Sequence, residues 1–133
     1  MTDLSKTDSL AGRLPLTPET RGILNRQTFG KVRRDMLPFG PAVINAARGG
    51  HQVEADLVLA LTDGTLGAAS LDVFEKEPLP EDSPLWGLPN CRITPHVAAV
   101  SDPQAGATYF ARVIRDHEAG APLPNLVDRD RGY

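Results

Sequence analysis

Short hydrophobic runs alternate along the chain with segments rich in polar residues, glycine and proline. Three of these runs, at residues 42–46, 66–74 and 92–94, contain many aliphatic and β-branched side chains. Runs of this length and composition are typical of strands that are buried in a sheet. The pattern therefore predicts three strands.

Two other segments have the spacing of amphipathic helices. Within residues 53–61, hydrophobic side chains recur three or four positions apart, and the Asp63-Gly64 pair behind them is a typical helix end. Residues 102–120 begin with Asp-Pro and end with Gly, which predicts a last helix. One face of that helix carries its apolar side chains, which are Ala107, Phe110, Ala111 and Ile114.

The remaining segments are shorter. Thr17 and Asn25 are typical N-cap residues, so we expect a short turn after the first and a short helix, ending at Phe29, after the second. Residues 1–13 show no hydrophobic period, and we expect an irregular N-terminal segment there. From residue 14 onwards, the order strand, helix, strand, strand, helix predicts an α/β fold with helices packed on a sheet.

Composition narrows the classes of function. The chain has 133 residues, enough for one small domain. It carries 14 Lys and Arg against 17 Asp and Glu and has no basic block, so its charge gives no reason to expect binding to nucleic acid or to an anionic membrane. One cysteine excludes an internal disulfide and fits a reducing compartment. Because no stretch is apolar enough for a membrane span or a secretory signal, we expect a soluble cytoplasmic protein.

Polar side chains follow each predicted strand. Arg48 follows the first, Asp72 and Glu77 follow the second, and His96 follows the third. Ligands bind beyond the carboxyl ends of the strands in open α/β sheets, so these residues are expected along one edge. Arginine binds a carboxylate through two parallel hydrogen bonds, and a histidine beside a carboxylate exchanges protons near neutral pH. Spacing alone leaves open the alternative that each is an ordinary surface residue.

Other candidate sites are weaker. His51 and Glu54 have the spacing of two metal ligands on a helix, but no further ligand pair accompanies them, so we expect no metal site. Cys91 stands at the start of a predicted buried strand, which favours a small core side chain over a nucleophilic thiol. A hydrolase that uses His96 would need a serine or cysteine in a nucleophile turn, and the sequence has none.

Taken together, the motifs of this chain resemble one enzyme family, the D-isomer-specific 2-hydroxyacid dehydrogenases. The motifs occur in the family's order from residue 14 onwards and are LPLTPET at 14–20, VINAARGG at 43–50, GAASLDVF at 67–74 followed by Glu77-Pro78, and TPH at 94–96. The closing residues, VDRDRGY at 127–133, resemble the glyoxylate/hydroxypyruvate reductase A subgroup.

The resemblance implies roles for the polar residues at the strand ends. Arg48 would hold the carboxylate of a 2-keto acid such as glyoxylate or hydroxypyruvate. His96 would protonate the carbonyl oxygen as hydride arrives from a nicotinamide cofactor, and Glu77 would keep His96 protonated. Asp72 would contact the nicotinamide carboxamide.

The resemblance also implies the fold and the remaining cofactor contacts. Pro15, Ala46, His96 and Ala99 would line the cofactor, NAD or NADP. The expected architecture is a partial Rossmann-type doubly wound parallel sheet, in which residues 14–133 form the C-terminal part of an NAD(P)-binding domain. Full-length family members are expected to form homodimers.

Only part of such an enzyme is matched. Family members are more than twice as long, with a further domain that shares the substrate cleft and a glycine-rich turn, G-x-G-x-x-G/A, that holds the pyrophosphate of the cofactor. This sequence contains no such turn. We therefore expect a truncated NAD(P)-dependent oxidoreductase with little activity by itself. The alternative is a non-catalytic remnant or an association partner of a longer family member, in which exposed hydrophobic surface pairs with another chain.

Overall fold

The computed structural model describes residues 3–35 and 37–130. Contacts within the chain divide it into two compact units, Met1–Ala98 and Ala99–Tyr133. Each unit is described by itself.

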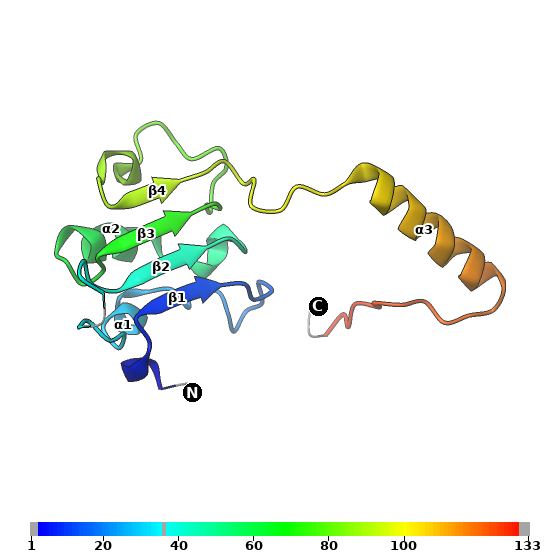
Figure 1. The fold of residues 1–133 in the computed structure, drawn as a ribbon, viewed down its shortest axis with the longest axis horizontal. Helices are drawn as coiled ribbons and strands as arrows, with labels where there is room; N and C mark the ends of the chain where they lie inside the picture. The colour runs from blue at the N-terminus through cyan, green and yellow to red at the C-terminus, as the bar shows by residue number, and fades with distance from the viewer. Residues whose placement is uncertain (1–2, 36, 131–133) are drawn as a thin grey trace. The chain divides into compact units, whose positions relative to one another are not determined.

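The first unit is built on a four-stranded parallel sheet (Figure 1). Its strands, β1 (Ser9–Gly12), β2 (Ala42–Asn45), β3 (Ala68–Leu71) and β4 (Cys91–Ile93), lie side by side in chain order. Because all neighbouring pairs are parallel, the carboxyl ends of the strands share one edge, where the segments that follow them meet. The three predicted strands and the α/β class are confirmed, although β3 is shorter than its hydrophobic run.

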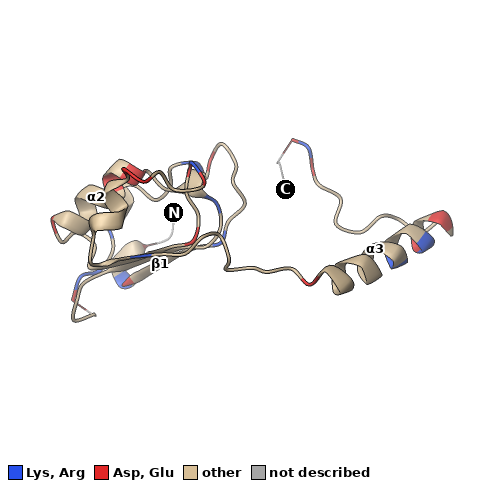
Figure 2. Ribbon diagram, turned by 90° about the horizontal axis from the view of Figure 1, so that it is seen from above, with Lys and Arg blue, Asp and Glu red and all other residues tan. Residues whose placement is uncertain are grey.

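Helices cover one face of this sheet. α1 (Arg26–Phe29) and α2 (Glu54–Thr62) contact each other, and α2 lies on one side of the sheet (Figure 2). Three 3-10 turns, η1 (Leu4–Lys6), η2 (Gly49–His51) and η3 (Pro84–Gly87), complete the unit. The large hydrophobic side chains that are fully buried in its core are Phe29, Val43, Leu57, Leu66, Leu71, Val73 and Leu85.

Capping residues set the ends of both helices. Asn25 precedes α1, and its Oδ1 accepts a hydrogen bond from the Thr28 amide at 3.0 Å. Asp63 follows α2, and Gly64 behind it has a φ of 78°, a left-handed conformation that costs glycine no steric strain. The two helices therefore confirm the sequence prediction, as does the turn that follows Thr17.

Among the described residues of the first unit, no helix lies on the opposite face of the sheet (Figure 2). The strand register places one residue from each strand in a row across this face, and all four are exposed: Ala11, Ile44, Ser70 and Arg92. We call these four residues the uncovered row. Parallel sheets in proteins are normally covered on both faces. The uncovered row is therefore a surface of a kind that other protein elements normally cover.

The expectation of an irregular segment at residues 1–13 is wrong for β1 and η1. Serine, alanine and glycine have weak strand propensity, but β1 gains backbone hydrogen bonds along the whole of β2. Packing also favours glycine at position 12, because a Cβ atom there would lie 3.2 Å from Oδ1 of Asn45. Tertiary pairing therefore overrides local propensity in this strand.

The second unit contains one long helix, α3 (Pro103–Glu118). The Asp102 carboxylate caps its first turn by accepting from the Gln104 amide at 2.9 Å, and Gly120 follows its end with a φ of 89°. This confirms the predicted last helix. Its apolar side chains Phe110 and Ile114 are exposed within the unit. Among the described residues, no helix is long and apolar enough to cross a membrane.

Candidate functional site

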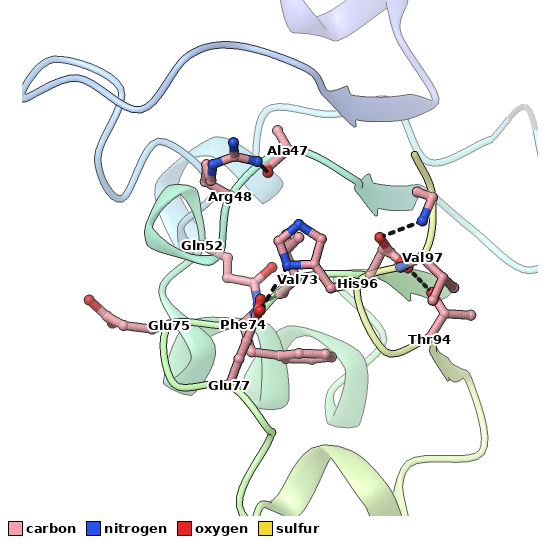
Figure 3. Close-up of polar contacts among 12 residues, drawn as sticks. Ala47, Arg48, Gln52, Val73, Phe74, Glu75, Glu77, Thr94, His96 and Val97 are labelled. Carbon is pink, nitrogen blue, oxygen red and sulfur yellow. Dashed lines mark hydrogen bonds and ion pairs between the residues drawn. The ribbon is translucent and has the colours of Figure 1, made fainter. Parts of the chain in front are cut away.

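A histidine–carboxylate pair lies at the carboxyl edge of the sheet (Figure 3). His96 follows β4, Glu77 follows β3, and Nδ1 of the imidazole lies 2.8 Å from Oε2 of the carboxylate. Because a carboxylate only accepts hydrogen bonds, Nδ1 carries the hydrogen in this contact. Nε2 of His96 is then the ring atom left for a ligand.

Glu77 is held as a carboxylate by two donors. Its second oxygen, Oε1, accepts a hydrogen bond from the Phe74 amide at 2.9 Å. The hydrogen bond from His96 and the one from Phe74 hold the pKa of Glu77 below its usual value. A carboxylate that stays ionised favours the protonated form of the imidazole beside it.

The backbone of His96 is also fixed. Its φ is 54°, in the left-handed region that few non-glycine residues adopt. Its amide lies within hydrogen-bonding distance of the carbonyl of Asp72 at 2.9 Å and of Thr94 at 3.1 Å. Sparsely populated backbone conformations persist where the surrounding structure enforces them, and they concentrate at functional sites.

Asp72 fixes the segment that carries His96. Asp72 is 6% exposed, and its carboxylate accepts hydrogen bonds from the amides of Val97 at 3.0 Å and Ala98 at 2.9 Å, and from the Thr94 hydroxyl. Although burial raises the pKa of Asp72, these hydrogen bonds together hold it below its usual value. Oδ2 accepts one hydrogen bond within the described residues, so it retains a lone pair for a further donor.

Arg48 faces the same region from the end of β2. Its side chain is exposed, and Nη1 donates to the Ala47 carbonyl at 2.7 Å. Within the described residues, no carboxylate lies within ion-pairing distance of its guanidinium. Arg48, Glu77 and His96 line one hollow of about 340 Å³. The structure therefore brings together the three predicted catalytic residues.

The predicted cofactor contacts are more dispersed. Pro15 is exposed, and its carbonyl lies 2.8 Å from the Thr20 hydroxyl and 3.2 Å from Nε2 of His51. Ala46 is exposed directly after β2. Ala99 belongs to the second unit, so it is described apart from the others. Asp72 meets His96 through its backbone carbonyl, as described above.

The weaker candidates have other environments. His51 is 1% exposed and lies against the Pro15 carbonyl, whereas Glu54 accepts a hydrogen bond from the Glu75 amide at 3.3 Å. In the described part of the chain, no three His, Cys, Asp or Glu side chains are placed so that they could hold a metal ion. Burial raises the pKa of the Cys91 thiol to about 11, which keeps it protonated at neutral pH and makes it a poor nucleophile.

Two features of the site have no signal in the sequence pattern. The Arg21 guanidinium and the Glu75 carboxylate, 3.1 Å apart, form an ion pair at the rim of the hollow. The Gln52 side chain reaches the backbone beside Asp72. Both contacts join residues more than twenty positions apart, and hydrophobic periodicity carries no information about such pairs.

Comparison with known proteins gives the family. The family described as D-isomer specific 2-hydroxyacid dehydrogenase, NAD binding domain, matches residues 2–98. A glyoxylate/hydroxypyruvate reductase A from Salmonella newport (strain SL254) is 47% identical over 130 residues, which are 98% of this chain and 40% of that protein. The chain thus spans about two fifths of the length of this relative.

Two solved structures are similar over nearly the whole chain. The NADPH-dependent glyoxylate/hydroxypyruvate reductase from Sinorhizobium meliloti, in complex with NADP and sulfate, is 53% identical with a TM-score of 0.93, over 98% of this chain and 41% of that one. A probable 2-hydroxyacid dehydrogenase from Rhizobium etli CFN 42, in complex with NADP, HEPES and L(+)-tartaric acid, is 52% identical with a TM-score of 0.88 and the same coverage.

These matches confirm the fold that the sequence motifs imply, a partial Rossmann-type parallel sheet with helices. The chain belongs to the D-isomer specific 2-hydroxyacid dehydrogenase family and carries part of its NAD-binding domain.

Proposed function

We propose that residues 14–133, together with β1, are the C-terminal part of the NAD(P)-binding domain of a reductase. The reaction is the reduction of small 2-keto acids, such as glyoxylate or hydroxypyruvate, to 2-hydroxy acids. The observation that carries this proposal is one hollow that holds an arginine without a carboxylate partner beside a histidine–glutamate pair.

Arg48 binds the substrate carboxylate. Its guanidinium lies at the surface of the hollow, where two parallel N–H donors match the two oxygens of a carboxylate. The nearby Arg21 is already paired with Glu75. Arg48 is therefore the better candidate for the substrate anion.

His96 donates the proton that the reduced carbonyl oxygen requires. A nicotinamide cofactor supplies the hydride when it is bound. Nδ1 of His96 is committed to Glu77, so Nε2 presents the transferable proton to the oxygen. A proton from solvent then reprotonates the imidazole for the next cycle, and the ionised Glu77 favours that protonated form.

Part of this chain fits the nicotinamide end of NAD or NADP. The free lone pair on Oδ2 of Asp72 suits the N–H donor of a carboxamide, and Pro15, Ala46 and Ala99 are the proposed apolar and backbone contacts. The similar structures from Sinorhizobium meliloti and Rhizobium etli hold NADP. No glycine-rich turn in this sequence would hold the pyrophosphate.

A chimera tests the proposal. It joins this chain to the portion of the Sinorhizobium meliloti reductase that the chain does not match, and NADPH-dependent glyoxylate reduction is measured. We expect turnover, and we expect His96→Gln to lower kcat by about 10²–10⁴ while the affinity for NADPH stays nearly the same. Near-normal kcat in the His96→Gln chimera would exclude the assignment of the proton donor.

A non-catalytic association partner is the second candidate. The uncovered row favours it, because a partner chain could cover that face of the sheet. A correctly folded chimera that binds NADPH but does not reduce any 2-keto acid would support this alternative. A homodimer and a cytoplasmic location are also proposals; the single cysteine supports the location.

A further inference from the structure

Two buried amide side chains lie beneath the site. Asn45, the last residue of β2, is 0% exposed, and Gln52, which follows η2, is 2% exposed. Nδ2 of Asn45 donates to Oε1 of Gln52 at 2.8 Å. Neither residue has a part in the proposed chemistry.

Asn45 holds the turn that carries Arg48. Its Nδ2 also donates to the carbonyl of Arg48 at 3.1 Å, and its Oδ1 accepts from the Ala47 amide at 3.2 Å. Both polar atoms of the Asn45 amide are thus engaged. The backbone of the arginine turn is tied directly to the end of β2.

Gln52 joins this turn to the segment that follows β3. Its Nε2 donates to the Val73 carbonyl at 3.1 Å (Figure 3). Val73 stands between Asp72 and Phe74, whose amide holds Glu77. The Asp72 amide in turn donates to the Asn45 carbonyl at 2.9 Å. The Asn45–Gln52 pair therefore connects both segments that supply side chains to the hollow.

The two segments also touch through backbone. A Cβ atom on Gly49 would lie 1.9 Å from the carbonyl carbon of Phe74. At this separation the two segments cannot approach each other any further. Hydrogen bonds that fix the spacing here therefore fix the position of Arg48 relative to Glu77.

We propose that Gln52 is a positioning residue: its amide, paired with Asn45, sets the placement of the Arg48 turn against the Asp72–Glu77 segment. The inference rests on the proposed function for its catalytic meaning. An apolar side chain at position 52 leaves the Val73 carbonyl without its donor and removes one acceptor from Asn45, and unpaired buried groups of this kind are costly. The segments then shift to reach other partners.

The test compares Gln52→Leu with a matched control, Asn90→Leu. Asn90, which is half-buried, likewise ties two segments through its side-chain amide, because Nδ2 donates to the carbonyls of Leu61 at 3.1 Å and Gly67 at 3.3 Å, but it precedes β4 at the other end of the sheet. Thermal unfolding of the 133-residue chain reports how much stability each variant loses. Gln52→Met, which keeps the length of the side chain, replaces Gln52→Leu if the latter does not fold.

The main measurement is NMR on the 133-residue chain, which requires no cofactor and no activity. Hydrogen exchange of the Phe74 amide and the carboxyl titration of Glu77 are recorded in each variant. We expect the position 52 variant to speed Phe74 exchange about tenfold or more and to move the Glu77 pKa up towards its usual value, with no change in Asn90→Leu. Unchanged exchange and titration in a folded variant would overturn the inference.

Kinetics of the chimera give the second measurement. We expect the position 52 variant to raise the KM for glyoxylate about tenfold, because the arginine is displaced, whereas Asn90→Leu leaves KM unchanged. An equal rise in both variants would show a general loss of structure and would overturn the inference. An inactive chimera would count against the proposed function only, because the NMR measurement stands without it.

Discussion

The side chains that would touch substrate differ from their neighbours in how their polar atoms are used. His96 commits Nδ1 to Glu77, and Arg48 uses one guanidinium nitrogen on the Ala47 carbonyl. The supporting residue Asn45, in contrast, engages both polar atoms of its amide within the described structure. Asp72 does both, because it holds the Val97 and Ala98 amides and keeps one lone pair on Oδ2 for the proposed cofactor contact.

Arg48→Lys tests the carboxylate contact at the residue scale. In the chimera we expect the KM for glyoxylate to rise sharply, on the order of tenfold or more, because an ammonium cannot reproduce two parallel hydrogen bonds. Steady-state kinetics with glyoxylate varied would measure it. Arg21→Lys is the control, since Arg21 is paired with Glu75; a KM that changes only in that control would reassign the role.

The sequence predicted that Arg48, Glu77 and His96 lie at one edge of the sheet, because the carboxyl ends of parallel strands meet there. It gave no indication that Gln52 contacts Val73 or that Thr94 donates to Asp72. Those contacts depend on side-chain directions in the folded core, and a single sequence contains no periodic signal for them. The positive φ of His96 is likewise a product of the surrounding hydrogen bonds.

At the scale of the elements, the Asp63 carboxylate at the end of α2 contributes to the stability of the fold in a way that depends on pH. Hydrogen bonds from Thr65 and from the Arg26 guanidinium lower the pKa of Asp63 from 3.8 to about 2. A carboxyl group whose pKa is lowered by folding stabilises the fold above its unfolded pKa, and this stability is lost as the pH falls through the folded value.

We therefore expect Asp63→Asn to lower the melting temperature at pH 7 and to flatten its decline between about pH 4 and about pH 2. Circular dichroism melts across that range would measure it. Glu81→Gln, at an exposed loop position, serves as the control. An identical pH profile for Asp63→Asn and the unaltered chain would contradict the expectation.

Because η2 lies so close to the segment after β3, we expect that adding one methyl group at Gly49 lowers the stability of the fold strongly. Gly49→Ala would place Cβ against the backbone of Phe74 and Glu75, which cannot rotate away as a side chain can. We expect a loss of roughly 2–4 kcal/mol in the free energy of unfolding, measured by urea denaturation. Gly87→Ala is the control, because a Cβ there meets nothing within 4 Å; equal losses would refute the packing argument.

Element types were predictable where a period or a helix-end residue was strong, as in α3 and at the Asp63-Gly64 end of α2. β1 was missed because Ser9–Gly12 has no hydrophobic alternation of its own. The strand forms because β2 offers a parallel edge, and glycine at position 12 avoids a tight contact with the Asn45 side chain. Strands of this kind are specified by their partner.

At the scale of the whole molecule, the sequence contains the proposed proton donor and the proposed carboxylate-binding arginine but no glycine-rich phosphate-binding turn. We expect the isolated 133-residue chain to bind NADH and NADPH weakly and to show little or no glyoxylate reduction. Holding the reacting groups in contact lowers the activation barrier by on the order of 7–11 kcal/mol in good cases. Most of this reduction is lost when the cofactor is not anchored.

Calorimetric titration of the chain with each cofactor, together with an assay of glyoxylate reduction, would measure this. The chimera with the Sinorhizobium meliloti portion is the positive control. Micromolar binding together with ordinary enzymatic turnover by the isolated chain would contradict the expectation, and would show that another feature replaces the glycine-rich turn.

The hydrogen bonds that Asp72 accepts from the Val97 and Ala98 amides have a mechanical consequence. These are the last residues of the first unit, and the second unit begins at Ala99. A force that pulls on the chain from the second unit would therefore act on the hydrogen bonds to the buried Asp72 carboxylate before it reached the sheet. His96 is held separately, by its amide contact with the Asp72 carbonyl and by Nδ1 on Glu77. A pull strong enough to break the two amide bonds would therefore free Val97 and Ala98 before it displaced the imidazole.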